Sequence, residues 1–213
     1  MFRPKQGSST MIHQSTLIAA FAIAAIAGMN PMAEAEVVEA ATWNGGGTDK
    51  NWNTAIGWQF TAKNDLTVTH LGVLDLGEAG LQDRHTVGIF NSAGDLMIST
   101  TISNGLVGDV FADSVIYNAV DLTTLQKDET YYILADNWSE DSYNYGWDSV
   151  NFSDDIEWLN YSQTSEGSIF STVQHLEGQP GNLGPSFMYT TVPAPGALAL
   201  LGLAAVAARR RRG

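Results

Sequence analysis

Apolar residues along most of this chain recur in short runs separated by Gly, Asn and Asp, and they rarely follow the spacing of an amphipathic helix. Many runs are rich in Val, Ile, Thr and aromatic residues, which favour β-strands. The alternation slips within residues 66–75, which indicates a bulge near His70 to Gly72. Residues 91–95 are typical of a hairpin turn. The pattern predicts seven strands, at residues 56–62, 66–75, 85–90, 96–102, 114–120, 130–135 and 186–191.

These strands predict a single all-β domain at residues 36–191, an antiparallel and jelly-roll-like β-sandwich. No helical crossover of a dozen or more residues separates the strands, as parallel pairing would require. A segment of 156 residues is long enough for one such core and too short for two.

The charge and the cysteine content of the chain limit the kinds of partner and chemistry that we expect. The predicted domain holds 22 of the 23 acidic residues but only four of the ten basic residues. Because an acidic surface repels phosphates and anionic headgroups, we expect no nucleic-acid partner. The chain has no cysteine, which excludes disulfides, thiolate catalysis and cysteine metal sites.

The N-terminal segment has the order of a secretory signal. Arg3 and Lys5 precede an apolar run at residues 16–29, and Ala33-Glu34-Ala35 supplies a small-x-small cleavage site. We therefore expect residues 1–35 to form a signal helix that signal peptidase removes by cutting between Ala35 and Glu36. A membrane anchor is the alternative, although the run is shorter than the roughly 20 residues of a span.

The C-terminal segment, residues 192–213, has an apolar run followed by four arginines. As a helix, residues 192–208 would extend about 25 Å, which is marginal for the hydrocarbon core of a membrane. Positive flanking residues stay in the cytoplasm. The segment therefore predicts a transmembrane helix that stalls in the membrane, with the domain on the other side.

This tail resembles the PEP-CTERM sorting signal of exosortase substrates. The resemblance rests on Pro193-Ala194-Pro195, the apolar run at 196–208, and the cluster of Arg209, Arg210, Arg211 and Arg212. The family usually has Glu at the position of Ala194. The resemblance implies that an exosortase cleaves near the Pro-x-Pro motif after the tail has held the chain in the inner membrane. It also implies a domain delivered to the cell surface or extracellular matrix of a Gram-negative-type bacterium, often together with exopolysaccharide.

The domain itself resembles jelly-roll-type domains of unknown function in secreted bacterial proteins. The matching features are Gly57-Trp58 with Phe60, Leu71-Gly72 before Asp75, and residues 85–89 before the turn at Gly94. This resemblance implies a fold and names no activity.

No catalytic motif stands out in the domain. His70, His85 and His175 are far apart and share no metal-ligand spacing, and G-x-S-x-G does not occur. We therefore expect a non-catalytic binding or structural module. The alternatives are a carbohydrate-binding module or a glycoside hydrolase acting on exopolysaccharide with a pair of carboxylates.

Residues 136–162 combine many aromatic residues with Asp, Asn and Ser, and three interpretations stay open. Exposed aromatic rings could stack on sugars. Carboxylates could hold Ca²⁺, the one cofactor considered. The stretch could also be a structural excursion fixed by its own aromatic residues. The candidate sugar-stacking residues are Trp138, Tyr143, Tyr145, Trp147 and Trp158, and the candidate calcium ligands are Asp75, Glu78, Asp83, Asp136 and Asp141.

Overall fold

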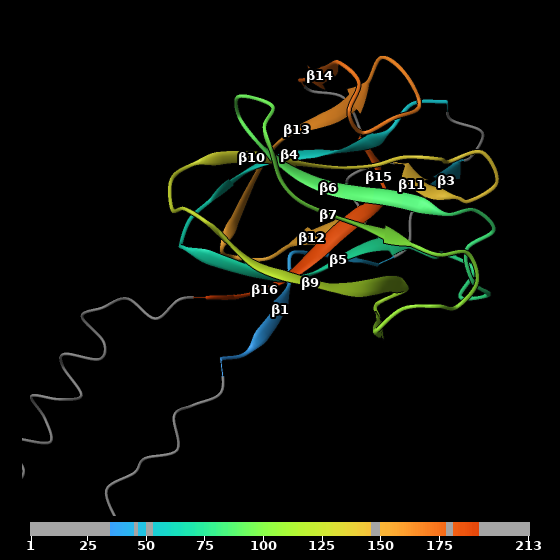
Figure 1. Ribbon diagram of the computed structural model, residues 1–213, viewed down its shortest axis with the longest axis horizontal. Helices are drawn as coiled ribbons and strands as arrows, with labels where there is room; N and C mark the ends of the chain where they lie inside the picture. Colours follow the sequence, from blue (N-terminus) through green and yellow to red (C-terminus); the bar gives the residue numbers. More distant parts are fainter. Residues whose placement is uncertain (1–34, 45–46, 50–52, 146–149, 178–180, 192–213) are drawn as a thin grey trace, which may run out of the picture. The chain divides into compact units, whose positions relative to one another are not determined.

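The computed structural model describes residues 35–44, 47–49, 53–145, 150–177 and 181–191. Throughout these residues the regular structure is β-strand with antiparallel pairing, which confirms the prediction of an all-β, antiparallel domain (Figure 1). The two predicted flanking helices, at the signal segment and at 196–208, lie outside the described residues. Within the described ranges, no helix is long and apolar enough to cross a membrane.

Two large sheets carry most of the strands, and they curl toward each other as a half-open barrel (Figure 1). In order across the first, five-stranded sheet lie β1 (Val37–Glu39), β16 (Pro185–Thr191), β5 (Leu66–Leu74), β9 (Val115–Leu125) and β8 (Val110–Ala112). In order across the second, six-stranded sheet lie β14 (Val173–Leu176), β13 (Ile156–Thr164), β4 (Ile56–Ala62), β10 (Thr130–Ala135), β6 (His85–Asn91) and β7 (Leu96–Ile102).

Short strands form two further small sheets. The three-stranded sheet has β15 (Asn182–Leu183), β11 (Tyr143–Tyr145) and β3 (Gly47–Asp49), and the two-stranded sheet pairs β12 (Val150–Phe152) with β2 (Ala41–Trp43).

The hydrophobic core lies between the two large sheets. Trp58 and Phe60 of β4 are fully buried, and both rings lie against Phe187 of β16 in the other sheet. The Trp58 indole nitrogen also donates to the Pro185 carbonyl at 2.9 Å. Burial of such large side chains is the main source of stability in a domain without disulfides.

The seven strands predicted from the sequence are all present, as β4, β5, β6, β7, β9, β10 and β16. The register of β5 shifts between Val68 and His70 against β9, so a bulge exists slightly before the predicted position. The β6–β7 hairpin turn is also present. There the Asn91 side chain accepts hydrogen bonds from the Ala93 and Asp95 amides, and Gly94 adopts φ 91°.

The interpretation of residues 136–162 as one long excursion is wrong for its C-terminal part. Residues 156–164 form β13, which pairs with both β4 and β14 inside the six-stranded sheet. Its register shifts between Trp158 and Asn160, so the alternation of buried and exposed residues is interrupted. That interruption hid the strand from a search based on period-two alternation.

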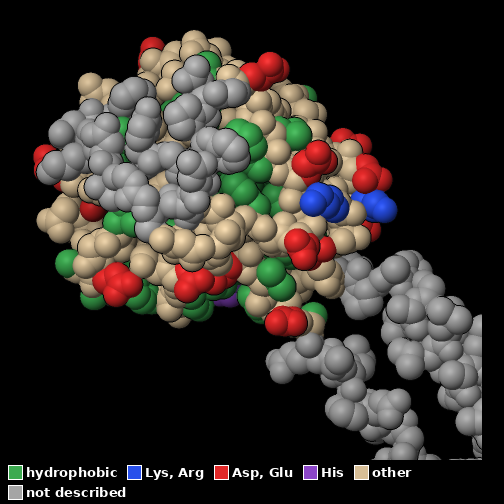
Figure 2. All heavy atoms as spheres, turned by 180° about the vertical axis from the view of Figure 1, so that it is seen from behind, with side chains coloured by type: hydrophobic (Ala, Val, Ile, Leu, Met, Phe, Trp, Pro, Cys, Tyr) green, Lys and Arg blue, Asp and Glu red, His purple; other side chains and the backbone are tan. Residues whose placement is uncertain are grey.

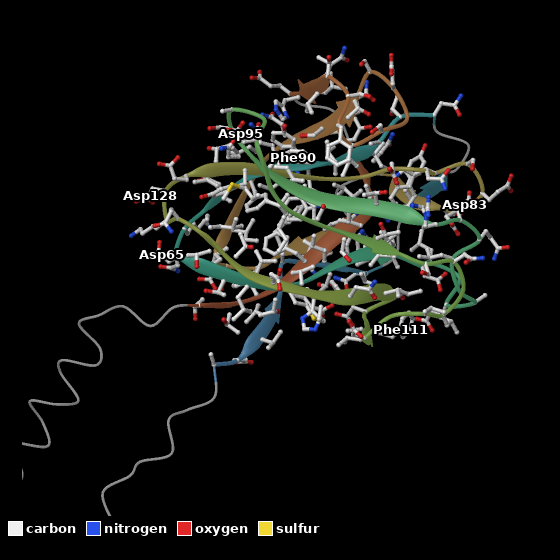
Figure 3. The ribbon with its side chains drawn as sticks, in the orientation of Figure 1. Asp65, Asp83, Phe90, Asp95, Phe111 and Asp128 are labelled. Carbon is white, nitrogen blue, oxygen red and sulfur yellow. The ribbon has the colours of Figure 1, made fainter. Side chains whose placement is uncertain are left out.

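One end of the domain holds its first and last residues, and the opposite end holds loops. β1 pairs with β16 and Val37 lies opposite Thr190, so the chain enters and leaves the domain at neighbouring positions. Thr191 is paired with Leu66, whereas the other end of β5 leads into the loop that carries Asp83. Figure 3 accordingly shows Asp65 and Asp128 at one end and Asp83 at the other. Acidic side chains outnumber basic ones on the face seen in Figure 2.

Candidate functional site

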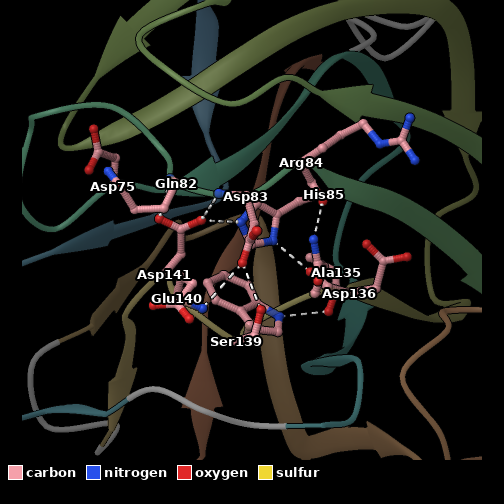
Figure 4. Close-up of polar contacts among 12 residues, drawn as sticks. Asp75, Gln82, Asp83, Arg84, His85, Ala135, Asp136, Ser139, Glu140 and Asp141 are labelled. Atoms are coloured by element: carbon pink, nitrogen blue, oxygen red, sulfur yellow. Dashed lines mark hydrogen bonds and ion pairs between the residues drawn. The ribbon is translucent and has the colours of Figure 1, made fainter.

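Two loops meet at the end of the domain far from Thr191. One follows β5 and covers residues 75–84, and the other follows β10 and covers residues 136–142. They meet because β6 and β10 pair with Ala135 opposite Val87, which places the end of β10 beside the start of β6. Three of the five predicted calcium ligands, Asp83, Asp136 and Asp141, come together here (Figure 4).

His85 lies at the centre of this cluster and is fully buried. Its Nδ1 lies 2.5 Å from the Asp136 carbonyl oxygen, and its Nε2 lies 3.0 Å from Oδ2 of Asp141. Both nitrogens therefore face oxygen acceptors, and both can donate only when the ring is an imidazolium. In that state His85 and Asp141 form a buried ion pair.

Asp141 joins the two loops through two further hydrogen bonds, both from backbone amides. Its Oδ1 accepts a hydrogen bond from the Gln82 amide at 2.8 Å. Its Oδ2 accepts one from the Asp83 amide at 2.7 Å and also contacts His85. Burial alone would raise the pKa of Asp141, but the hydrogen bonds from His85 and the two amides lower that pKa below its ordinary value. The carboxylate therefore remains ionised and fixed.

The neighbouring carboxylates are also engaged by local donors. Asp83 accepts the Ser139 hydroxyl at 2.7 Å and the Glu140 amide at 3.2 Å. Asp136 accepts the Thr86 amide at 2.6 Å, although burial raises its pKa above the ordinary value. These contacts resemble capped turns, in which a carboxylate satisfies the backbone amides of a loop.

The remaining two calcium candidates are also hydrogen-bonded, Asp75 within its own loop and Glu78 to the turn between β8 and β9. Asp75 accepts the Gly80 amide at 2.8 Å, and Glu78 accepts the Ser114 hydroxyl at 2.9 Å. In the described part of the chain, no three Asp, Glu or His side chains are grouped so that they could hold a metal ion. Each of the five carboxylates accepts a hydrogen bond from an amide or a hydroxyl.

The predicted sugar-stacking surface is wrong for Trp138 and Tyr143, because both side chains are fully buried. The Trp138 indole donates to the Ala135 carbonyl at 2.8 Å, and its ring lies 4.7 Å from the His85 ring and 5.9 Å from Tyr143. A Cβ atom on Gly184 would come within 2.1 Å of the indole. Trp138 therefore fills a closed space under the two loops and offers no face to a ligand.

Of the other three aromatic candidates, only Trp158 has a side chain among the described residues. Trp158 is half-buried and packs against Phe152, with ring centroids 6.4 Å apart. The side chain of Tyr145 and all of Trp147 lie outside the described residues.

The other two histidines of the described residues, His70 and His175, stand apart from this cluster. His70 contacts the Thr69 hydroxyl at 3.0 Å, and His175 contacts the Ser162 hydroxyl at 2.8 Å. Burial lowers the pKa of His175. Ser162 itself is fully buried on β13, so this serine–histidine pair has no open approach for a substrate.

A shallow groove of about 330 Å³ lies between β1–β2 and the β12–β13 turn, with Glu39 and Asp155 among its lining residues. Tyrosine hydroxyls hold both carboxylates from the core side: Tyr117 donates to Glu39 at 3.1 Å and Tyr189 donates to Asp155 at 3.0 Å. Burial and the nearby Asp113 raise the pKa of Glu39. Buried tyrosines commonly satisfy their hydroxyls in this way.

Sequence reasoning did not pair His85 with Asp141, which lies 56 positions further along the chain. His85 follows a turn and begins a strand, and neither feature distinguishes a buried ion pair from a surface histidine. The signal that would have found it is the strand pairing itself, which requires three-dimensional information.

The lowered pKa of Asp141 predicts a pH dependence of stability. The ionised carboxylate stabilises the fold above its ordinary pKa of about 3.9, and that contribution is lost as the pH falls through the lower pKa of the folded state. We expect the free energy of unfolding, measured by urea titration between pH 7 and pH 3, to fall less steeply at acid pH in Asp141→Asn. Asp136→Asn is the matched control, because its raised pKa acts with the opposite sign. An unchanged acid limb in Asp141→Asn would contradict this assignment.

Comparison with known proteins identifies no relative: no family model matches the chain, and neither a curated protein nor a solved structure shows significant similarity to it.

Proposed function

We propose that this protein is an exported, non-catalytic binding or structural module of jelly-roll-like architecture, sorted by an exosortase to the cell surface or extracellular matrix. The observation that carries the proposal is the order of the tail: Pro193-Ala194-Pro195, a short apolar run, and four terminal arginines. The signal-like segment at residues 1–35 supplies the matching export step.

The limits of the strands are compatible with both cuts. β1 begins at Val37, just after the expected new N-terminus at Glu36, and β16 ends at Thr191, just before the tail. β16 is paired on both sides, with β1 and β5. Removal of the two terminal segments would therefore leave every pairing of the described strands in place.

The non-catalytic part of the proposal rests on how the polar groups are used. The buried histidine and the carboxylates around it are hydrogen-bonded within and between two loops. Hydrogen bonds of this kind fix the conformation of the two loops at the domain surface. The acidic composition supports an extracellular location, where a high net charge favours solubility.

Processing of the tail can be tested with one pair of substitutions. We expect the double variant Pro193→Ala, Pro195→Ala to accumulate uncleaved in the inner membrane, because proline keeps the segment extended and separate from the apolar helix. Intact-mass measurement of the surface fraction should find wild-type protein beginning at Glu36 and ending near the Pro-x-Pro motif.

A conservative pair at the end of β16, Thr190→Ser and Thr191→Ser, provides the matched control and should be processed normally. Replacement of Arg209 to Arg212 by Ser should weaken retention in the membrane before cleavage, since each arginine would otherwise have to cross the hydrocarbon. A surface species that still carries residues 198–212 would show that the tail is a plain anchor and that the proposal is wrong.

A further inference from the structure

A pocket of about 160 Å³ lies between the loop that follows β5 and the loop that follows β10. The first loop contributes Asp75 and the apolar side chains of Leu76 and Ala79, and the second contributes Glu140 and Asp141. None of the described residues that line the pocket is basic. The lining therefore combines carboxylates from both loops with apolar side chains from one of them.

The carboxylate of Asp75 is buried with little to compensate its charge. Asp75 is only 6% exposed, and its Oδ2 accepts the Gly80 amide at 2.8 Å. Among the described residues no donor is bonded to its Oδ1, and the ion pair found there is that of His85 with Asp141. A buried carboxylate usually has a counter-ion or several hydrogen-bond donors. Asp75 therefore leaves one acceptor oxygen and one negative charge available to the pocket.

The nearby basic side chains do not supply the missing charge. Figure 4 shows the Arg84 guanidinium on the opposite side of His85 from Asp75 and Asp141. His85 itself is engaged by Asp141, with 3.0 Å between Nε2 and Oδ2. Glu140, which is exposed, adds a further negative charge to the lining. A cation that enters from outside would therefore meet two carboxylates without counter-ions.

The lining suits an organic ammonium better than a metal ion. Ca²⁺ takes six to eight oxygen ligands, and the described residues contain no group of three acidic or histidine side chains placed to hold a metal. A primary ammonium has three N–H donors. The pocket offers it Asp75 Oδ1, the Glu140 carboxylate and the Ser142 hydroxyl. Leu76 and Ala79 provide apolar contact for the carbon atoms attached to the nitrogen.

We propose that this pocket binds a primary ammonium group on a short aliphatic stem, such as a lysine side chain or a free alkylamine, with Asp75 Oδ1 as the anchor. The stem would lie against Leu76 and Ala79. Asp141 already holds the Gln82 amide at 2.8 Å, so the shape of the pocket is set before a ligand arrives. Ammonium binding here would not depend on how the tail is processed.

The test is an NMR titration of the exported protein at pH 7 and low salt, followed by the Gly80 amide, which is bonded to Asp75. We expect n-butylamine and Nα-acetyl-lysine methylamide to bind with a Kd on the order of 1 mM, and n-butanol, which lacks the charge, not to bind. Added salt should weaken binding, because it screens the ionic contact. Tighter binding of the lysine derivative would identify a peptide as the source, and equal binding a free amine.

Two variants separate this site from general attraction to an acidic surface. Asp75→Asn keeps an oxygen that can accept the Gly80 amide, and it should weaken n-butylamine binding about tenfold or more. Asp83→Asn is the matched control, because it removes the same charge from the same loop but does not line the pocket. A Cβ on Gly77 would meet only Asp75 Oδ1, at 4.0 Å, so Gly77→Leu should fill the pocket and abolish binding without destabilising the domain. Urea unfolding checks the stability of each variant.

Equal affinity of Asp75→Asn and Asp83→Asn for n-butylamine would overturn the proposal, because the Asp75 carboxylate would then not be the anchor. Unchanged binding in Gly77→Leu would also overturn it, since the amine would lie elsewhere on the acidic surface. A third contrary result would be displacement of the amine by micromolar Ca²⁺, because the occupant of the pocket would then be a metal ion. Absence of any shift in the wild-type protein at tens of millimolar amine would exclude the site.

Discussion

Replacing Trp138 with alanine is expected to destabilise the domain by about 3–5 kcal/mol, the usual cost of removing a buried tryptophan. The indole is fully buried between His85 and Tyr143, and its nitrogen is hydrogen-bonded to the Ala135 carbonyl. The substitution leaves a cavity that the rigid strand ends cannot close. Urea unfolding at pH 7, followed by tryptophan fluorescence and circular dichroism, measures the loss.

Phe170→Ala is the matched control, because that ring is 65% exposed and makes an edge contact with Phe90. It should change the free energy of unfolding by well under the amount lost in Trp138→Ala. If both variants were equally stable, Trp138 would not be a core residue, and its predicted role on a ligand surface would return.

The longer strands could be predicted from the sequence because each is a run rich in β-branched or aromatic residues. The limits of β4, β7 and β10 coincide with the predicted residues. The small strands were not predicted because they are too short. β8, β11 and β12 have three residues each, too few for any period to be recognised.

The aromatic stretch shows why composition does not fix a role. Trp138 and Tyr143 are flanked by Asp, Asn and Ser, which suggested an exposed loop. Both rings are nevertheless buried, and Gly184, which lies 46 positions after Trp138, provides the space that Trp138 occupies. The polar neighbours are needed because loops above a core must satisfy their own amides, as Asp83 does for Glu140.

Local sequence could predict that carboxylates gather near the loops, but not what those carboxylates bind. The sequence groups Asp136 and Asp141 as candidate calcium ligands because both are acidic residues in a polar stretch. Their partners are the Thr86 amide and His85, which the antiparallel pairing of β6 and β10 brings beside them. A contact that depends on pairing across 50 or more positions leaves no local pattern.

His85→Ala is expected to cost about 3–5 kcal/mol, because it removes a fully buried side chain and the hydrogen-bond partner of the largely buried Asp141 carboxylate. The substitution also removes the donor to the Asp136 carbonyl, so the two loops lose their common contact. Urea unfolding gives the loss of stability, and hydrogen exchange of the Gln82 and Asp83 amides reports whether the loops separate.

The pair is isolated by a double-mutant cycle with Asp141→Ala. If the two residues act as an ion pair, the double variant should be at least as stable as the less stable of the two single variants. The reason is that each single variant leaves one buried charge without a partner, and the double variant removes that charge as well. His70→Ala is the matched control: this histidine is half-buried and its Nδ1 is hydrogen-bonded to the adjacent Thr69 hydroxyl, away from the two loops, so its loss should leave the loop amides unchanged. Additive losses in the cycle would mean that His85 and Asp141 stabilise the loops independently, through packing and through backbone amides respectively.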